Sequence, residues 1–148
     1  MSSIAQYPDV EFVVIVNPNS GPYAEFPNGQ AGHLSLPGHD YCREVPRLTA
    51  CRNVTAVGYI RVDYCKKPLS QVFAEMETYA NWARSPGMGL GGVFVDETPN
   101  HYSAERVDYL IALQHGLKTM DGFSRPPLVC LSLASISRLV SHFPITVL

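Results

Sequence analysis

Four short apolar runs recur along the chain, with helical segments between the last three, and this alternation constrains the fold most. The runs that we predict as strands cover residues 11–16, 54–60, 92–95 and 128–133. Residues 68–83 and 104–120 carry apolar side chains at the spacing of a helix with one buried face. Because strands joined by a helix pair in parallel through a right-handed crossover, the pattern predicts an α/β fold with about four parallel strands.

Local signals define the helix ends, whereas the first connection is irregular. Pro68 suits the first turn of one helix, and Ser103 is a suitable N-cap for the other. Residues 21–40 are rich in Gly, Pro, Asn and His, which predicts a long loop. A helix over residues 41–51 is conceivable, but Pro46 would break or kink it.

The composition argues against two classes of partner. The formal net charge is −2 at pH 7, and the longest basic cluster is Lys66 with Lys67. Because phosphate binding depends on clustered Lys and Arg, we expect no nucleic-acid partner. No apolar run approaches the roughly 20 residues of a membrane-spanning helix, so we expect no membrane span. Residues 1–8 lack the features of a secretory signal, which leaves the localisation unassigned.

Cofactor motifs are missing or stand in the wrong context. Residues 87–92 match the dinucleotide pattern G-x-G-x-x-G, but they follow a predicted helix and lead into a predicted strand. The dinucleotide site needs the reverse order, so we interpret this segment as a loop. The histidines and cysteines show no metal-ligand spacing. We therefore expect no metal and no other cofactor.

Asp96 and Glu97 are the main candidates for catalysis. They follow the apolar run at 92–95 directly, and the carboxyl ends of parallel strands are where α/β enzymes place their sites. Successive strand residues point to opposite faces, so one carboxylate could face a cleft while the loop orients the other. The alternative is that both cap the next helix or form surface ion pairs.

Three further residues are candidates for binding a sugar. Asn17 follows the first strand, where its side chain could reach a sugar hydroxyl or simply cap the strand through an Asx-type turn. Tyr59 and Asp63 lie near the end of the second strand in a mixture of aromatic and charged residues. Such a mixture suits sugar rings and hydroxyls, but ordinary polarity at a sheet edge explains it equally well.

Several blocks of the sequence together resemble the spherulin-4 (spherulation-specific) family of fungi and slime moulds. The blocks cover residues 10–22, 53–59 and 92–97, and the helix end at 78–82 adds to them. The resemblance extends over roughly residues 7–128. It implies a (β/α)8 TIM-barrel-like fold, of which this chain would carry a part.

The resemblance also implies a function and a site. Relatives are secreted or cell-surface glycoside hydrolases that cut fungal cell-wall polysaccharide containing N-acetylgalactosamine. The Asp-Glu pair of the family falls on Asp96 and Glu97, which makes both expected catalytic carboxylates, with their individual roles left open. By the same implication, a polysaccharide is the expected partner, and Asn17, Tyr59 and Asp63 would line its cleft.

The departures from the family pattern qualify this expectation. The family has an earlier strand and helix and a further catalytic glutamate on a later strand, and we find no matching positions here. We expect a partial barrel domain over residues 1–128 and an atypical tail over 129–148, with a gene-model artefact as the hypothesis for the tail. Catalysis would then be impaired, and the alternative is a non-catalytic spore- or wall-associated structural or glycan-binding protein.

Overall fold

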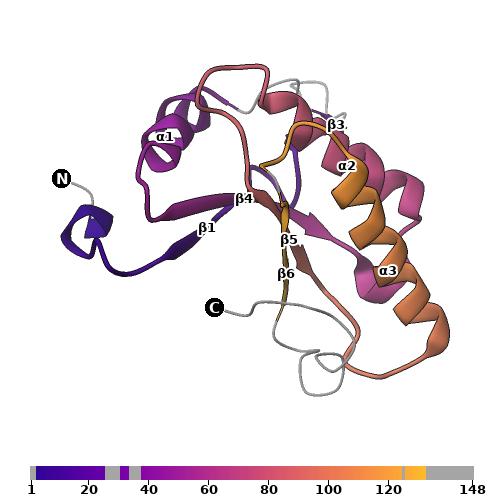
Figure 1. Ribbon diagram of the computed structural model, residues 1–148. Helices are drawn as coiled ribbons and strands as arrows, with labels where there is room; N and C mark the ends of the chain where they lie inside the picture. The colour runs from indigo at the N-terminus through magenta and orange to yellow at the C-terminus, as the bar shows by residue number, and fades with distance from the viewer. Residues whose placement is uncertain (1–2, 26–30, 34–37, 125, 133–148) are drawn as a thin grey trace.

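The computed structural model of the protein describes residues 3–25, 31–33, 38–124 and 126–132. Its centre is a parallel four-stranded sheet with the strand order β1-β4-β5-β6 (Figure 1). The strands are β1 (Phe12–Val16), β4 (Val54–Arg61), β5 (Gly92–Asp96) and β6 (Leu128–Leu131). Because all four run in the same direction, their carboxyl ends share one edge of the sheet.

The regular α/β part of the prediction is confirmed. The strands predicted over 11–16, 54–60 and 92–95 each differ from the structure by one boundary residue, and the strand predicted from 128 ends at Leu131. The two predicted helices are α2 (Leu69–Trp82) and α3 (Ala104–Thr119). Ser103 caps α3, since its hydroxyl accepts a hydrogen bond from the N–H of Arg106 at 3.3 Å.

The prediction for the first connection is wrong in two respects. A two-stranded antiparallel sheet, formed by β2 (Tyr23–Glu25) and β3 (Ala31–His33), lies within the predicted loop. Strands of three residues are too short to show a hydrophobic period. In addition, α1 (His39–Thr49) continues through Pro46. The proline ring packs closely against Gly87, where an added Cβ would come within 2.7 Å of it, and a contact between residues so far apart does not show in a local pattern.

One face of the parallel sheet, here called the helix face, carries the hydrophobic core. Gly58 belongs to it, because a Cβ at this position would come within 2.6 Å of the Tyr79 ring of α2. By the alternation of strand side chains, Ile60 and Val95 share this face. Buried residues from the sheet and from α1, α2 and α3 form one cluster, which includes Val45, Ile60, Trp82, Val93, Val95 and Leu117. The three helices therefore pack on the same side of the sheet.

The other face of the sheet, here called the opposite face, is partly apolar and partly polar. It carries Ile15, Val57, Tyr59, Arg61, Phe94 and Asp96. Val57 is fully buried but lies outside the core cluster, whereas Ile15 is 44% exposed. Tyr59 and Asp96 are thus separated from the core by the sheet itself.

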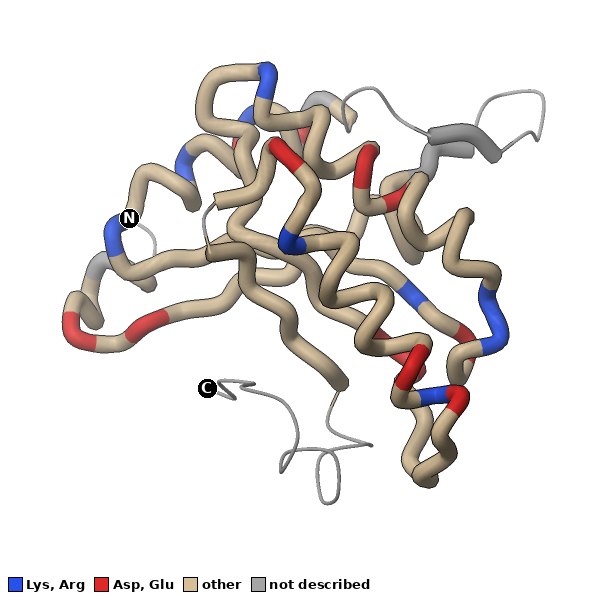
Figure 2. The backbone as a smooth tube through the Cα atoms, turned by 45° about the vertical axis from the view of Figure 1, so that its right-hand side comes forward, with Lys and Arg blue, Asp and Glu red and all other residues tan. Residues whose placement is uncertain are grey.

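The architecture is that of a partial (β/α)8 TIM-barrel-like fold with four parallel strands and intervening helices. Strand β6 spans the boundary that we predict between residues 128 and 129, and most of the expected tail, 133–148, lies outside the described residues. None of the helices in the described ranges is long and apolar enough to cross a membrane. Lys and Arg are dispersed along the described backbone rather than gathered on one element (Figure 2).

Candidate active site

The carboxyl ends of β4 and β5 bring aromatic and charged side chains together on the opposite face. The two strands pair with Tyr59 opposite Phe94 and Arg61 opposite Asp96. The rings of Tyr59 and Phe94 stack, with their centroids 6.0 Å apart. Since ligands of α/β proteins bind at this edge of the sheet, these residues define the candidate active site.

Asp96 is the last residue of β5, and donors from three segments hold its carboxylate. The Tyr59 hydroxyl donates a hydrogen bond to Oδ2 at 2.7 Å. The backbone N–H of Glu97 donates to Oδ1 at 2.8 Å. The side chain of Ser132, directly after β6, contributes a further hydrogen bond. Together these bonds fix the orientation of the carboxylate, as charge-assisted hydrogen bonds do.

The same contacts fix the protonation state of the pair formed by Asp96 and Tyr59. Desolvation is the largest influence on the pKa of Asp96 and raises it, but the hydrogen bonds from Tyr59, Glu97 and Ser132 together outweigh it, so the pKa is lowered. Burial, the hydrogen bond to Asp96 and the nearby negative charges raise the pKa of Tyr59 to about 12. At neutral pH, Asp96 is therefore an ionised acceptor and Tyr59 a protonated donor.

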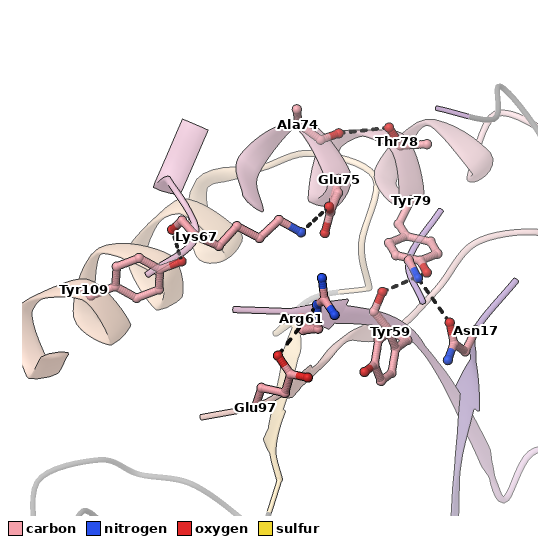
Figure 3. A network of polar contacts seen from close by, with 11 residues as sticks. Asn17, Tyr59, Arg61, Lys67, Ala74, Glu75, Thr78, Tyr79, Glu97 and Tyr109 are labelled. Atoms are coloured by element: carbon pink, nitrogen blue, oxygen red, sulfur yellow. Dashed lines mark hydrogen bonds and ion pairs between the residues drawn. The ribbon is translucent and has the colours of Figure 1, made fainter. Parts of the chain in front are cut away.

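Glu97 lies just beyond β5, in a backbone conformation that differs from that of Asp96. Its φ is 53°, in the left-handed region that non-glycine residues seldom adopt. Its Oε2 lies 3.6 Å from Nε of Arg61, in an ion pair whose side chains are 32% and 52% exposed (Figure 3). An ion pair this accessible contributes little to stability, so it orients Glu97 loosely.

Of the other predicted residues, Tyr59 joins the site most directly. The carbonyl Oδ1 of Asn17 accepts a hydrogen bond from the N–H of Gly21 at 3.1 Å, which is the turn that we considered as the alternative for Asn17. Figure 3 shows Asn17 near the carboxyl end of β1. Asp63 lies on the turn after β4, and its side chain is exposed. The described contacts do not link Asp63 to Asp96 or Glu97.

Sequence reasoning missed two residues that shape the site. Tyr79, fully buried on α2, donates from its hydroxyl to the carbonyl of Tyr59 at 2.9 Å and to that of Val16 at 3.4 Å. It thereby joins the ends of β1 and β4. Arg61 meets Glu97 only because β4 and β5 pair in this register. For Tyr79, the one available signal in the sequence was Gly58, whose lack of a side chain makes room for the Tyr79 ring.

The arrangement has the elements that carbohydrate chemistry needs. Within the described ranges, no group of three or more His, Cys, Asp or Glu is placed to hold a metal ion. An ionised carboxylate beside stacked aromatic rings can accept hydrogen bonds from sugar hydroxyls and stabilise a positively charged transition state. A general acid needs a raised pKa, so the lowered pKa of Asp96 argues for a role as an anion rather than as a proton donor.

Comparisons with known proteins agree with one another. The sequence model of spherulation-specific family 4 matches residues 1–135. Spherulin-4 of Physarum polycephalum is 32% identical over 114 residues, which cover 77% of this chain and 29% of that protein. A solved structure, the crystal structure of Aspergillus clavatus Sph3 in complex with GalNAc, superposes with a TM-score of 0.77 at 35% identity. The superposition covers 86% of this chain and 48% of Sph3. The chain thus spans less than a third of the one relative and about half of the other.

Proposed function

The chain belongs to spherulation-specific family 4, and from this membership we propose that it is a glycoside hydrolase-like protein that binds polysaccharide containing N-acetylgalactosamine. Asp96 and Glu97 are the proposed catalytic carboxylates, and Tyr59, Asn17 and Asp63 the proposed sugar-binding residues. The proposed setting is a fungal cell surface, where such polysaccharides occur. Because the chain spans about half of Sph3, activity of the whole protein is part of the proposal.

The hydrogen bond between Tyr59 and Asp96 is the observation that carries this proposal. It fixes an ionised carboxylate at the carboxyl edge of a barrel-like sheet, beside a pair of stacked aromatic rings. GalNAc is bound in the crystal structure of Sph3, a relative with a similar fold. A sugar of this kind offers hydroxyl donors to Asp96 and a ring face to the aromatic side chains.

The environments of the two carboxylates support different roles. Asp96 is proposed to remain ionised and to stabilise the positive charge that develops on the sugar ring. Glu97 has a side chain that is 32% exposed and forms an ion pair with Arg61. A side chain held in this way can move with the substrate, so we leave open whether Glu97 transfers a proton or only orients the sugar.

Non-catalytic glycan binding is the second candidate, and the placement of the two carboxylates favours it. Glycosidases of the usual kind need two carboxyl groups that flank the scissile bond. Asp96 and Glu97 are adjacent in sequence and come from one strand end, so they do not by themselves form a pair of this kind. Such an arrangement can bind a sugar without cleaving it.

Asp96→Asn with a matched control separates these possibilities. We expect wild-type protein to bind oligosaccharides of N-acetylgalactosamine, measured by calorimetry, and Asp96→Asn to bind at least about tenfold more weakly, because one charged hydrogen bond is worth about 1.5 kcal/mol or more. The control Asp108→Asn makes the same chemical change at an exposed position on α3 and should bind as wild type.

Release of reducing ends from the same oligosaccharides decides whether turnover occurs. If wild type releases them and Asp96→Asn and Glu97→Gln slow the release by about 100-fold or more, the catalytic proposal is supported. Binding without release would support the second candidate. Wild-type affinity together with an unchanged rate of release in both Asp96→Asn and Glu97→Gln would contradict the assignment of these residues to the site.

A further inference from the structure

The turn after β4 adopts a backbone conformation that needs external support. Asp63, Tyr64 and Cys65 have φ values of 47°, 54° and 67°, so three successive non-glycine residues are left-handed. Each such residue is disfavoured by contact between its Cβ and the backbone. Strained residues of this kind persist only where the surrounding structure holds them, and they cluster at functional sites.

The turn is bonded directly to the backbone of the carboxylate pair. The N–H of Val62 donates to the carbonyl of Asp96 at 3.1 Å, and the N–H of Tyr64 donates to the carbonyl of Glu97 at 2.7 Å. Glu97 is itself left-handed, and its N–H donates to Oδ1 of Asp96. The position of the turn therefore determines the backbone geometry from which both carboxylates project.

The other end of the turn is anchored in the helix layer through Lys67. The N–H of Lys67 donates to the carbonyl of Val62 at 3.2 Å. Its ammonium group pairs with Glu75 of α2, which is fully buried, and its carbonyl accepts a hydrogen bond from the Tyr109 hydroxyl of α3 at 2.7 Å (Figure 3). Removing either partner would leave the other charge buried without compensation, which is strongly destabilising. The two side chains are therefore held together in this contact.

We propose that Lys67 and Glu75 are positioning residues, which lock the left-handed turn at 62–67 and through it hold Asp96 and Glu97 in place for the sugar. The part that concerns the sugar rests on the function proposed above. Neither residue touches the substrate in this account, since Glu75 lies behind the sheet on α2. Their effect reaches the site through the two backbone hydrogen bonds from Val62 and Tyr64.

The double variant Lys67→Met/Glu75→Leu tests the anchor without leaving an unpaired buried charge. Replacing a buried ion pair by apolar residues of similar volume is often neutral for stability, so the variant should remain folded. We expect faster amide hydrogen exchange at Val62 and Tyr64 and a pKa of Asp96 that returns towards its ordinary range, both measured by NMR. We also expect affinity for GalNAc oligosaccharides to fall at least about tenfold, as displaced binding groups lose productive geometry.

The pair Tyr64→Gly and Tyr64→Val tests the turn itself and does not depend on whether the double variant folds. Both changes remove the same half-exposed ring. Glycine accepts the left-handed conformation, whereas β-branched valine resists it. In Tyr64→Gly, we expect the amide hydrogen exchange of Val62 and the pKa of Asp96 to match those of wild type. In Tyr64→Val, we expect faster amide exchange at Val62 and a higher pKa of Asp96 than in wild type.

The readouts in the absence of sugar separate this inference from the proposed function. If exchange and the pKa of Asp96 respond as expected but no form binds GalNAc oligosaccharides, the positioning role is supported and the proposed function is wrong. If the double variant and Tyr64→Val both keep the exchange rates, the pKa and any sugar affinity of wild type, the positioning role is wrong, and Lys67 and Glu75 serve stability alone.

Discussion

The two faces of the parallel sheet differ in what they contribute. On the helix face, Ile60 is fully buried, and it belongs to the cluster that unites all three helices with the sheet. On the opposite face, Ile15 is 44% exposed, and the strand ends carry Tyr59 and Asp96. The comparison teaches that the hydrophobic core is concentrated on the first face and the proposed chemistry on the second. Mutations should therefore separate the two properties.

The largest expected effect is a difference in stability between two Ile→Ala substitutions, one on each face of the sheet. Ile60→Ala should lower the free energy of unfolding by about 2–5 kcal/mol, because it removes buried methylene groups and leaves a cavity. Ile15→Ala removes the same atoms from a half-exposed site and should cost less than about 1 kcal/mol. Urea denaturation followed by circular dichroism measures both. Equal losses would show that the opposite face is packed as tightly as the helix face.

Gly58→Ala tests the link between the faces. An added Cβ would overlap the Tyr79 ring, and overpacking of this kind costs about 1–3 kcal/mol. Because the Tyr79 hydroxyl also bonds the carbonyl of Tyr59, the displaced ring should disturb the site as well. Gly38→Ala is the control, since a Cβ at Gly38 meets nothing within 4 Å. A Gly58→Ala protein as stable as the control would contradict the close approach of α2 to β4.

Tyr59→Phe should affect the site more than the fold. It removes one hydrogen bond to an ionised carboxylate, at a cost of about 1.5 kcal/mol, and keeps the ring that stacks on Phe94. The pKa of Asp96 should rise, because the hydroxyl that favours its ionised form is gone. NMR titration of the carboxyl carbon measures this shift. An unchanged pKa would mean that the Glu97 N–H and Ser132 hold Asp96 without help from Tyr59.

The smallest effect concerns the stability of wild type at the two ends of the pH range. A lowered pKa of Asp96 adds stability at neutral pH, which is lost as the pH falls below about 3.8 and through the lowered value. The raised pKa of Tyr59 adds stability that is present below pH 10 and is lost as the pH rises towards about 12. In Tyr59→Phe the contribution of Asp96 should be smaller and that of Tyr59 should be absent, measured as the difference between the two stability curves.

Much of the fold could be predicted because its signals are local. The period of apolar residues gave α2 and α3 to within a residue at each end, and Ser103 caps α3 as expected. The short strands β2 and β3 show no hydrophobic period. The continuation of α1 through Pro46 goes with the packing of this proline against Gly87. Such tertiary contacts are not visible in a single sequence.

The position of Asp96 and Glu97 at the end of a parallel strand was predictable, whereas their contacts were not. The end of an apolar run located Asp96 and Glu97, because chemistry at a parallel sheet gathers at its carboxyl edge. The hydrogen bond from Tyr59 and the ion pair from Arg61 depend on the register of β4 and β5, which turns and helices set from a distance. The left-handed turn after β4 contains no glycine, so nothing in its sequence marks it.

The most direct test of the account is an NMR titration of the protein with an oligosaccharide of N-acetylgalactosamine. The account predicts that chemical shifts change at Tyr59, Phe94, Asp96 and Glu97, while core residues of the helix face such as Ile60 and Val93 keep theirs. This result would locate the sugar at the carboxyl edge of the opposite face. No change at saturating sugar, or changes confined to α2 and α3, would contradict the central claim that Asp96 and its neighbours form the binding site.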